Sequence, residues 1–174
     1  MTEFEALITL NFIPDIGGIR LKRLFEYFGN ACNILEASED KLQKIEGITK
    51  NIANKIKNLS KNGVVLDKEL NLIKKNNIKV LTINDKNYPV SLKAITDPPI
   101  VLYVKGQIKT EDLISISLVG SRRASFYGIV TAENLAKELA LKKICVVSGM
   151  ARGIDTASHK GALKAGGRTI AILG

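Results

Sequence analysis

The chain has 174 residues, of which 45% are hydrophobic, so it can bury the core of one medium domain or of a small domain joined to a second one. No apolar run approaches the ~18 residues that cross a bilayer, so the composition excludes a membrane-spanning protein. The acidic N-terminus lacks the basic region of a secretory signal, so the sequence predicts a cytoplasmic protein. The formal net charge is +9, and a basic protein attracts polyanions, nucleic acids above all.

The first region, residues 1–77, is predicted to be a small domain of short helices. Apolar residues recur at helical spacing from Phe4 onwards, and Pro14 ends that segment. Two later segments, 16–24 and 45–56, place a glycine between apolar residues and continue into a helix that bears lysines. This pattern is typical of SAM/helix-hairpin-helix-like domains, because the glycine turn of a helix-hairpin-helix exposes backbone N–H groups that bind phosphate. A helical bundle whose turns need glycine has the same pattern, and the net charge of only +2 in this region favours packing over DNA contact.

The second region, residues 78–174, changes to the short apolar runs of a sheet and has a net charge of +7. The predicted strands are 78–83, 100–104, 114–119, 144–147 and 169–173, and the predicted helices are 126–142 and 154–165. The alternation of strands and helices predicts an α/β fold with a partial Rossmann-like parallel sheet. Such sheets bind ligands at the carboxyl ends of their strands, so the loops at those ends are the candidate sites.

The loop after the third predicted strand has the composition of an anion site. Gly120 lets an anion approach the backbone, Ser121 adds a hydroxyl group, and Ser125 is the predicted cap of the following helix. Arg122 can hold a phosphate through two parallel hydrogen bonds, and Arg123 adds a second positive charge beside it. A turn with solvated arginines would have the same composition.

The loop after the fourth predicted strand supplies five further candidates for phosphate contact. They are Ser148, Gly149, Ala151, Arg152 and Gly153. The two glycines, four positions apart, permit unusual backbone angles and the close approach of a ligand. The helix that follows holds Gly161 in its interior, and tight packing of that helix against the sheet explains the small residues as well as a ligand would.

The same helix contains two pairs of polar residues that lie one turn apart. Lys160 and Lys164 either extend the phosphate-binding surface or form a solvated face. Asp155 and His159 can share a hydrogen bond, but a catalytic role would need a nucleophile, and Ser148 lacks the GxSxG context. We therefore interpret Asp155 and His159 as structural.

The sequence predicts no cofactor, no metal site and no catalytic residue. Cys32 and Cys145 form no CxxC pair and are expected to be buried, reduced thiols, and a single histidine is too few for a usual zinc site. Neither GxxxxGK[ST] nor GxGxxG occurs, which argues against an ATP-binding P-loop and against the usual dinucleotide site.

The two loops together resemble the DNA-processing protein A family (DprA, also called Smf). The matching residues are Val119–Arg122, Ser125, Tyr127, Gly128, Ser148–Ala151, Gly153–Asp155, His159, Gly161–Leu163, Gly166, Gly167 and Thr169–Ala171, preceded by Tyr88, Pro89, Leu92, Asp97–Pro99, Leu102, Tyr103 and Gly106. Each motif alone is weak, but their order and spacing over residues 85–174 are specific, and the helical N-terminal region agrees in kind.

The resemblance implies a non-catalytic protein of natural transformation that binds incoming single-stranded DNA, protects it and helps to load the RecA recombinase. It makes Arg122 the strongest candidate for a phosphate contact. The sheet of this family continues beyond the position of Gly174, and the contacts with RecA and those of a homodimer are expected in that continuation.

Two other functions remain open on the sequence. One is a nucleotide-cleaving enzyme related to the lysine-decarboxylase-like phosphoribohydrolases, which have a similar sheet, although their PGGxGTxxE signature is absent from this chain. The other is a scaffold whose helical domain binds another protein. Release of a free base from nucleoside monophosphates would indicate the enzyme, and a lack of DNA affinity at ~0.15 M salt would indicate the scaffold.

Overall fold

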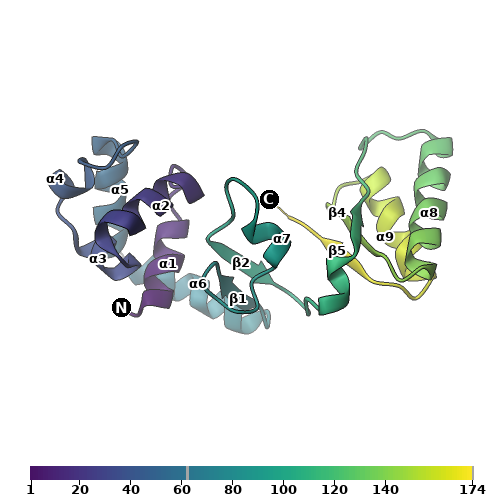
Figure 1. The fold of residues 1–174 in the computed structure, drawn as a ribbon, viewed down its shortest axis with the longest axis horizontal. Coiled ribbons are helices and arrows are strands. Elements are labelled where there is room, and N and C mark those ends of the chain that lie inside the picture. The colour runs from purple at the N-terminus through teal and green to yellow at the C-terminus, as the bar shows by residue number, and fades with distance from the viewer. Residues whose placement is uncertain (62, 174) are drawn as a thin grey trace. The chain divides into compact units, whose positions relative to one another are not determined.

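The computed structural model describes residues 1–61 and 63–173, so Gly174 lies outside the described residues. The chain forms two compact units, residues 1–107 and 108–174 (Figure 1). Helices and a parallel sheet are both present, which confirms the predicted α/β class. Within the described residues, no helix is both long and apolar enough to cross a membrane.

The helical part of the first unit has the short helices that the sequence predicts. These are α1 (Glu3–Asn11), α2 (Gly18–Phe28), α3 (Ala31–Glu36), α4 (Glu39–Leu42), α5 (Lys50–Lys61) and α6 (Gly63–Lys75). Thr2 and Glu5 form a reciprocal cap at the start of α1, because each side chain accepts a hydrogen bond from the backbone N–H of the other residue, at 3.2 and 2.8 Å. Fully buried side chains from successive helices, Leu10, Leu24, Ile34 and Ile56 among them, form one core.

A two-stranded antiparallel ribbon completes the first unit. Strand β1 (Lys79–Thr82) pairs with β2 (Val101–Val104), and the short helix α7 (Val90–Lys93) lies in the connection between them. Ile100 and Val101 are buried in the same core as the helices. The sequence analysis places the ribbon with the parallel sheet and the boundary at 77/78, whereas the compact units meet at 107/108. The difference arises because the apolar side chains of β2 pack on the helical core.

The second unit contains the predicted Rossmann-like parallel sheet. Its elements are the 3₁₀ helix η1 (Thr110–Leu113), β3 (Ser115–Ser117), α8 (Phe126–Leu141), β4 (Cys145–Ser148), α9 (Ile154–Lys164) and β5 (Thr169–Ala171). The strand order is β3-β4-β5, with Ile116 opposite Val146 and Val147 opposite Ile170 in parallel ladders. Because all three strands run in the same direction, the loops that leave β3 and β4 meet at one edge of the sheet.

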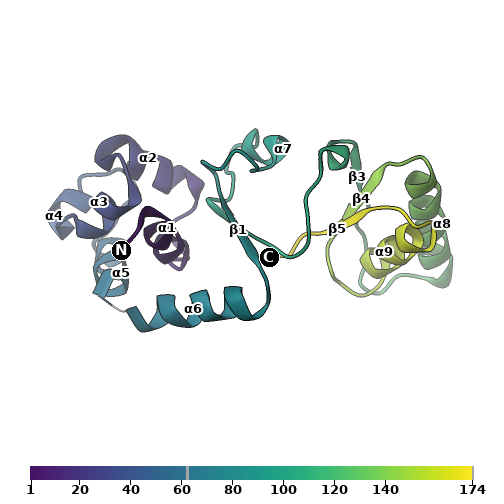
Figure 2. The same ribbon diagram turned by 90° about the horizontal axis from the view of Figure 1, so that it is seen from below.

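Helices α8 and α9 pack against each other on one side of this sheet (Figure 2). Val146 of β4 is buried with small side chains of both helices, Ala136, Ala140 and Ala162. A Cβ atom at Gly161 would overlap the backbone carbonyl of Glu133 in α8. The glycine inside α9 is therefore required by contact with the neighbouring helix, which is neither of the two explanations, the sheet or a ligand, that the sequence left open.

An ion pair between the buried Asp112 and the half-buried Arg168 ties η1 to the segment before β5. Nη2 of Arg168 donates to the carboxylate of Asp112 at 2.6 Å, and Nε of Arg168 also contacts this carboxylate. Hydrogen bonds from Arg168 hold the pKa of Asp112 below its usual value. Burial, together with the nearby Asp112 charge, raises the pKa of the Cys145 thiol to about 11. Cys145 and Cys32 are both free thiols, but only Cys145 is buried; Cys32 is half-buried.

Candidate nucleic-acid interface

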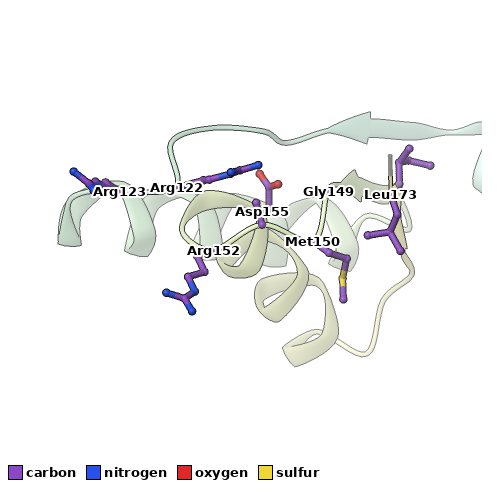
Figure 3. A pocket seen from close by; sticks show the side chains of 9 residues that line it. Arg122, Arg123, Gly149, Met150, Arg152, Asp155 and Leu173 are labelled. Carbon is purple, nitrogen blue, oxygen red and sulfur yellow. The ribbon is translucent and has the colours of Figure 1, made fainter. Parts of the chain in front are cut away.

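An open cavity of about 690 Å³ lies at this edge of the sheet (Figure 3). The loops that follow β3 and β4 line one side of the cavity, and the residues after β5 line another side of the same cavity. The backbone ladder extends to this edge, since the N–H of Leu118 donates to Val147 at 2.9 Å and the N–H of Ile172 donates to Ser148 at 2.8 Å. The cavity is lined by Arg122, Arg123, Gly149, Met150, Ala151, Arg152, Asp155, Ile172 and Leu173. Five of the residues that the sequence analysis selects are thus brought together: Arg122, Arg123, Gly149, Ala151 and Arg152.

Short-range hydrogen bonds fix the loop between β3 and α8. The hydroxyl oxygen of Ser121 accepts the N–H of Arg123 at 3.1 Å. The hydroxyl oxygen of Ser125 accepts the N–H of Gly128 at 3.1 Å, which confirms Ser125 as the cap of α8. These serine side chains therefore set the course of the backbone that presents the two arginines.

Gly153 joins this loop to the loop after β4. Its φ of +85° is a conformation that favours glycine, and a Cβ atom there would overlap the carbonyl oxygen of Ser121 and lie 3.0 Å from the carbonyl carbon of Arg122. The next N–H, that of Ile154, donates to the same Ser121 oxygen at 3.3 Å. Gly120 has a similar role, because a Cβ atom there would meet the Ile154 side chain at 2.7 Å. Both glycines serve close packing between the loops.

Ser148 is buried at the end of β4 and does not line the cavity. Its hydroxyl group donates to the carbonyl oxygen of Leu118 at 2.6 Å, so it holds the strand ends together. The predicted contact of Ser148 with phosphate is therefore not supported by its position.

The guanidinium groups of the cavity are unpaired within the part of the chain that the structure describes. Arg122, Arg123 and Arg152 are exposed, and among the described residues none of them forms a hydrogen bond or ion pair through its guanidinium group. Figure 3 shows that the Arg122 head group points towards the region of Asp155, whereas Arg123 and Arg152 extend in other directions. The lining contains three arginines and one carboxylate, that of Asp155, so it has a net positive charge. An unpaired guanidinium is free to bind a phosphate with two hydrogen bonds.

His159, Lys160 and Lys164 of α9 do not line the cavity. Lys164 forms an ion pair with Glu133 of α8, and Lys160 is exposed but does not line the cavity. The ring nitrogens of His159 bond to the Thr169 hydroxyl group at 2.7 Å and to the Gly149 carbonyl oxygen at 2.5 Å, and not to Asp155. His159 thus holds the loop after β4 in place through the Gly149 carbonyl group, in line with the structural interpretation of this residue.

The two glycine turns of the first unit contact other side chains of the same unit. The carboxylate of Asp97 accepts the N–H of Ile19 at 3.1 Å at the start of α2, where a phosphate would bind. In the second turn, the carbonyl oxygen of Gly47 accepts a hydrogen bond from Arg20 at 3.0 Å. These contacts favour the packing role for both turns.

The sequence analysis did not select Met150, Ile172 and Leu173, and it gave Asp155 a purely structural role. Met150 lies between two selected residues, so selection of the whole loop after β4 would have included it. Ile172 and Leu173 line the cavity because β5 pairs with β4, which places the end of β5 beside the loop after β4.

A family model, several curated relatives and a solved structure belong to one group of proteins. The family model described as DNA recombination-mediator protein A matches residues 79–174, a range that begins near the predicted boundary at 77/78. The DNA processing protein DprA of Bacillus subtilis (strain 168) is 42% identical over 100 residues, which cover 55% of this chain and 33% of that protein. The protein Smf of Synechocystis sp. (strain ATCC 27184 / PCC 6803 / Kazusa) is 30% identical over 166 residues, which cover 93% of this chain and 42% of that protein.

A solved structure extends the similarity over both units. The X-ray structure of DNA processing protein A (DprA) from Streptococcus pneumoniae matches with a TM-score of 0.73 and 28% sequence identity, and the match covers 98% of this chain and 57% of that one. The chain therefore spans between a third and about three-fifths of the length of the relatives it matches.

Proposed function

The chain belongs to the DNA recombination-mediator protein A family, and we propose that it binds single-stranded DNA through the cavity at the carboxyl ends of β3 and β4. The observation that carries this proposal is the set of three unpaired guanidinium groups at Arg122, Arg123 and Arg152 on two loops that the protein holds in place by its own hydrogen bonds. A sugar-phosphate chain presents successive anions, and several fixed cations at one edge of a sheet suit such a ligand.

The wider role is proposed from the family. We infer that the protein acts in natural transformation, where it protects incoming single-stranded DNA and helps to load the RecA recombinase, and that it works in the cytoplasm, with self-association as a homodimer. The names of the relatives, DNA processing protein and recombination mediator, support a role in DNA processing.

The proposal is tested by the salt dependence of oligo-dT binding, measured by fluorescence anisotropy. Each phosphate neutralised in a single strand contributes about −0.7 to the slope of log K against log salt concentration. Arg122→Ala is expected to weaken binding about tenfold and to make the slope shallower by about 0.7. The triple variant of Arg122, Arg123 and Arg152 is expected to make it shallower by about 2.

Lys137→Ala is the matched control, because Lys137 is an exposed cation of α8 that does not line the cavity. It removes one positive charge but is expected to leave the slope within about 0.2 of the wild-type value. If Arg122→Ala and Lys137→Ala have equal effects, binding depends on overall charge and the assignment of the site is wrong. Release of a free base from nucleoside monophosphates would instead favour the nucleotide-cleaving enzyme.

A further inference from the structure

Two aromatic side chains stand unpacked at the start of α8. Phe126 is 84% exposed and Tyr127 is 79% exposed, the largest exposed fractions among the large hydrophobic side chains of the described residues. A fully buried aromatic residue removes roughly 150–250 Å² of surface from water, so these two rings leave a large apolar area available to a partner.

The rings are held on a rigid element. Ser125 caps α8 directly before Phe126, through the hydrogen bond at 3.1 Å from Gly128. A Cβ atom at Gly128 would be in contact with Ile154 of α9 at 3.6 Å, so this first turn also lies close against the neighbouring helix. The backbone that bears both rings is therefore fixed, and a ligand would lose little conformational entropy when it binds there.

The aromatic residues also lie close to the arginine loop in the chain. Phe126 lies three positions after Arg123, which limits the distance between their Cα atoms to about 11 Å. From Leu113 to Ala132 the sequence contains no acidic residue. The surroundings of the rings are thus cationic, and exposed aromatic rings beside cations are the combination by which proteins bind single-stranded nucleic acids. This combination favours a nucleic acid over a protein as the partner.

We propose that Phe126 and Tyr127 stack on the bases of a single strand whose phosphates are bound by the arginines of the adjacent cavity; this inference rests on the function proposed above. Every base has a π-face, so the contact is tolerant of sequence. The bases of a duplex are already stacked and paired, so the rings select single strands. The arginines attract the phosphates of any nucleic acid, and the aromatic residues make the site prefer a single strand to a duplex.

The test compares two polymers of equal length, oligo-dT and an abasic deoxyribose-phosphate strand, by fluorescence anisotropy over a range of salt. Base–aromatic stacking contributes about 1–3 kcal/mol per base, which corresponds to about 5- to 150-fold in affinity. We expect wild-type protein to bind oligo-dT within this range more tightly than the abasic strand. Phe126→Ala/Tyr127→Ala is expected to lose that advantage, to bind the abasic strand like wild type, and to keep the wild-type salt slope.

Two further variants separate stacking from other effects. Phe126→Leu/Tyr127→Leu keeps apolar side chains on α8, and we expect it to lose the preference for bases as the alanine variant does. Leu141→Ala is the matched control, because Leu141 is 57% exposed at the far end of the same helix. We expect it to leave both affinities unchanged. Since all these side chains are exposed, thermal unfolding midpoints should remain within about 2 °C of wild type.

The outcomes distinguish this inference from the function on which it rests. Equal wild-type affinity for the two polymers, or an unchanged preference for oligo-dT in the alanine variant, overturns the stacking role and leaves the Arg122 site standing. Equal losses on both polymers overturn it too, since the phosphate loop would then be disturbed. If wild-type protein binds neither polymer, both proposals fail.

Discussion

Replacement of Gly153 by alanine should damage both the stability of the second unit and its binding site. The φ of +85° at this position is sparsely populated by residues with a side chain, at a cost of about 1–3 kcal/mol. The added methyl group would also overlap the Ser121 carbonyl oxygen and lie 3.0 Å from the Arg122 carbonyl carbon, and both are backbone atoms. Relief of the overlap requires the β3–α8 loop to move, at a further cost of about 1–3 kcal/mol. We expect a total loss of about 4 kcal/mol.

Gly166→Ala is the matched control for this substitution. Gly166 also has a positive φ, of +66°, but a Cβ atom there would have no neighbour within 4 Å. Its cost is therefore limited to the backbone strain of about 1–2 kcal/mol. For a unit of this size, 1 kcal/mol corresponds to about 4–8 °C. Thermal unfolding followed by circular dichroism should show a drop of more than 10 °C for Gly153→Ala and of about 5–10 °C for Gly166→Ala.

Oligo-dT binding below the unfolding transition completes the test. Because the displaced loop presents Arg122, Gly153→Ala should weaken binding about tenfold, whereas Gly166→Ala should bind like wild type. Equal midpoints for the two variants would show that the clash with Ser121 is relieved without cost. Wild-type affinity in Gly153→Ala would show that the position of the loop does not control the site.

The remaining predictions concern the Asp112–Arg168 ion pair and the glycine turn before α2. Asp112→Asn should cost about 2 kcal/mol at pH 7, less than the 3–5 kcal/mol of a fully buried pair, because the Arg168 side chain is 30% exposed. Since Arg168 lowers the pKa of Asp112, the stabilisation in wild type is complete above about pH 4 and is lost as the pH falls through the lowered pKa. The free energies of unfolding of wild type and variant, measured in urea, should therefore converge in acid. Free energies that keep a constant difference down to pH 3 would contradict this prediction. Gly18→Ala should destabilise the first unit by about 1–3 kcal/mol, because its methyl group would overlap the Asp97 carboxylate and lie 2.9 Å from the carbonyl oxygen of Pro98. Gly17→Ala is the control, because its methyl group would lie 3.4 Å from the same carboxylate, and it should cost less than about 1 kcal/mol. Equal effects of Gly17→Ala and Gly18→Ala on the free energy of unfolding in urea would argue against the close contact between α2 and Asp97.

The sequence by itself determined the elements of the second unit and the place of its candidate site. The runs at 114–119, 144–147 and 169–173 became β3, β4 and β5, and the helical pattern at 126–142 became α8. These features depend on local periodicity and on caps such as Ser125, which act over a few residues. The rule that ligands bind at the carboxyl ends of parallel strands then selected the two loops.

The tertiary structure decided which residues of those loops face the cavity. Ser148 belongs to the same sequence motif as Gly149, but its hydroxyl group is used by Leu118, 30 positions away. Lys164 is used by Glu133, 31 positions away, and is thereby removed from the set of free cations. No local pattern indicates either partner, because each contact exists only after strands or helices have paired.

The first unit shows the same limit over a longer range. The glycine turn before α2 has the sequence of a phosphate site, yet Asp97, 78 positions from Ile19, occupies it. The ribbon of β1 and β2 has the local pattern of a sheet, yet its apolar side chains join the helical core. Periodicity fixes the type of an element, whereas the burial of its apolar face against a distant partner fixes its place, and that partner is chosen only when the whole chain has folded.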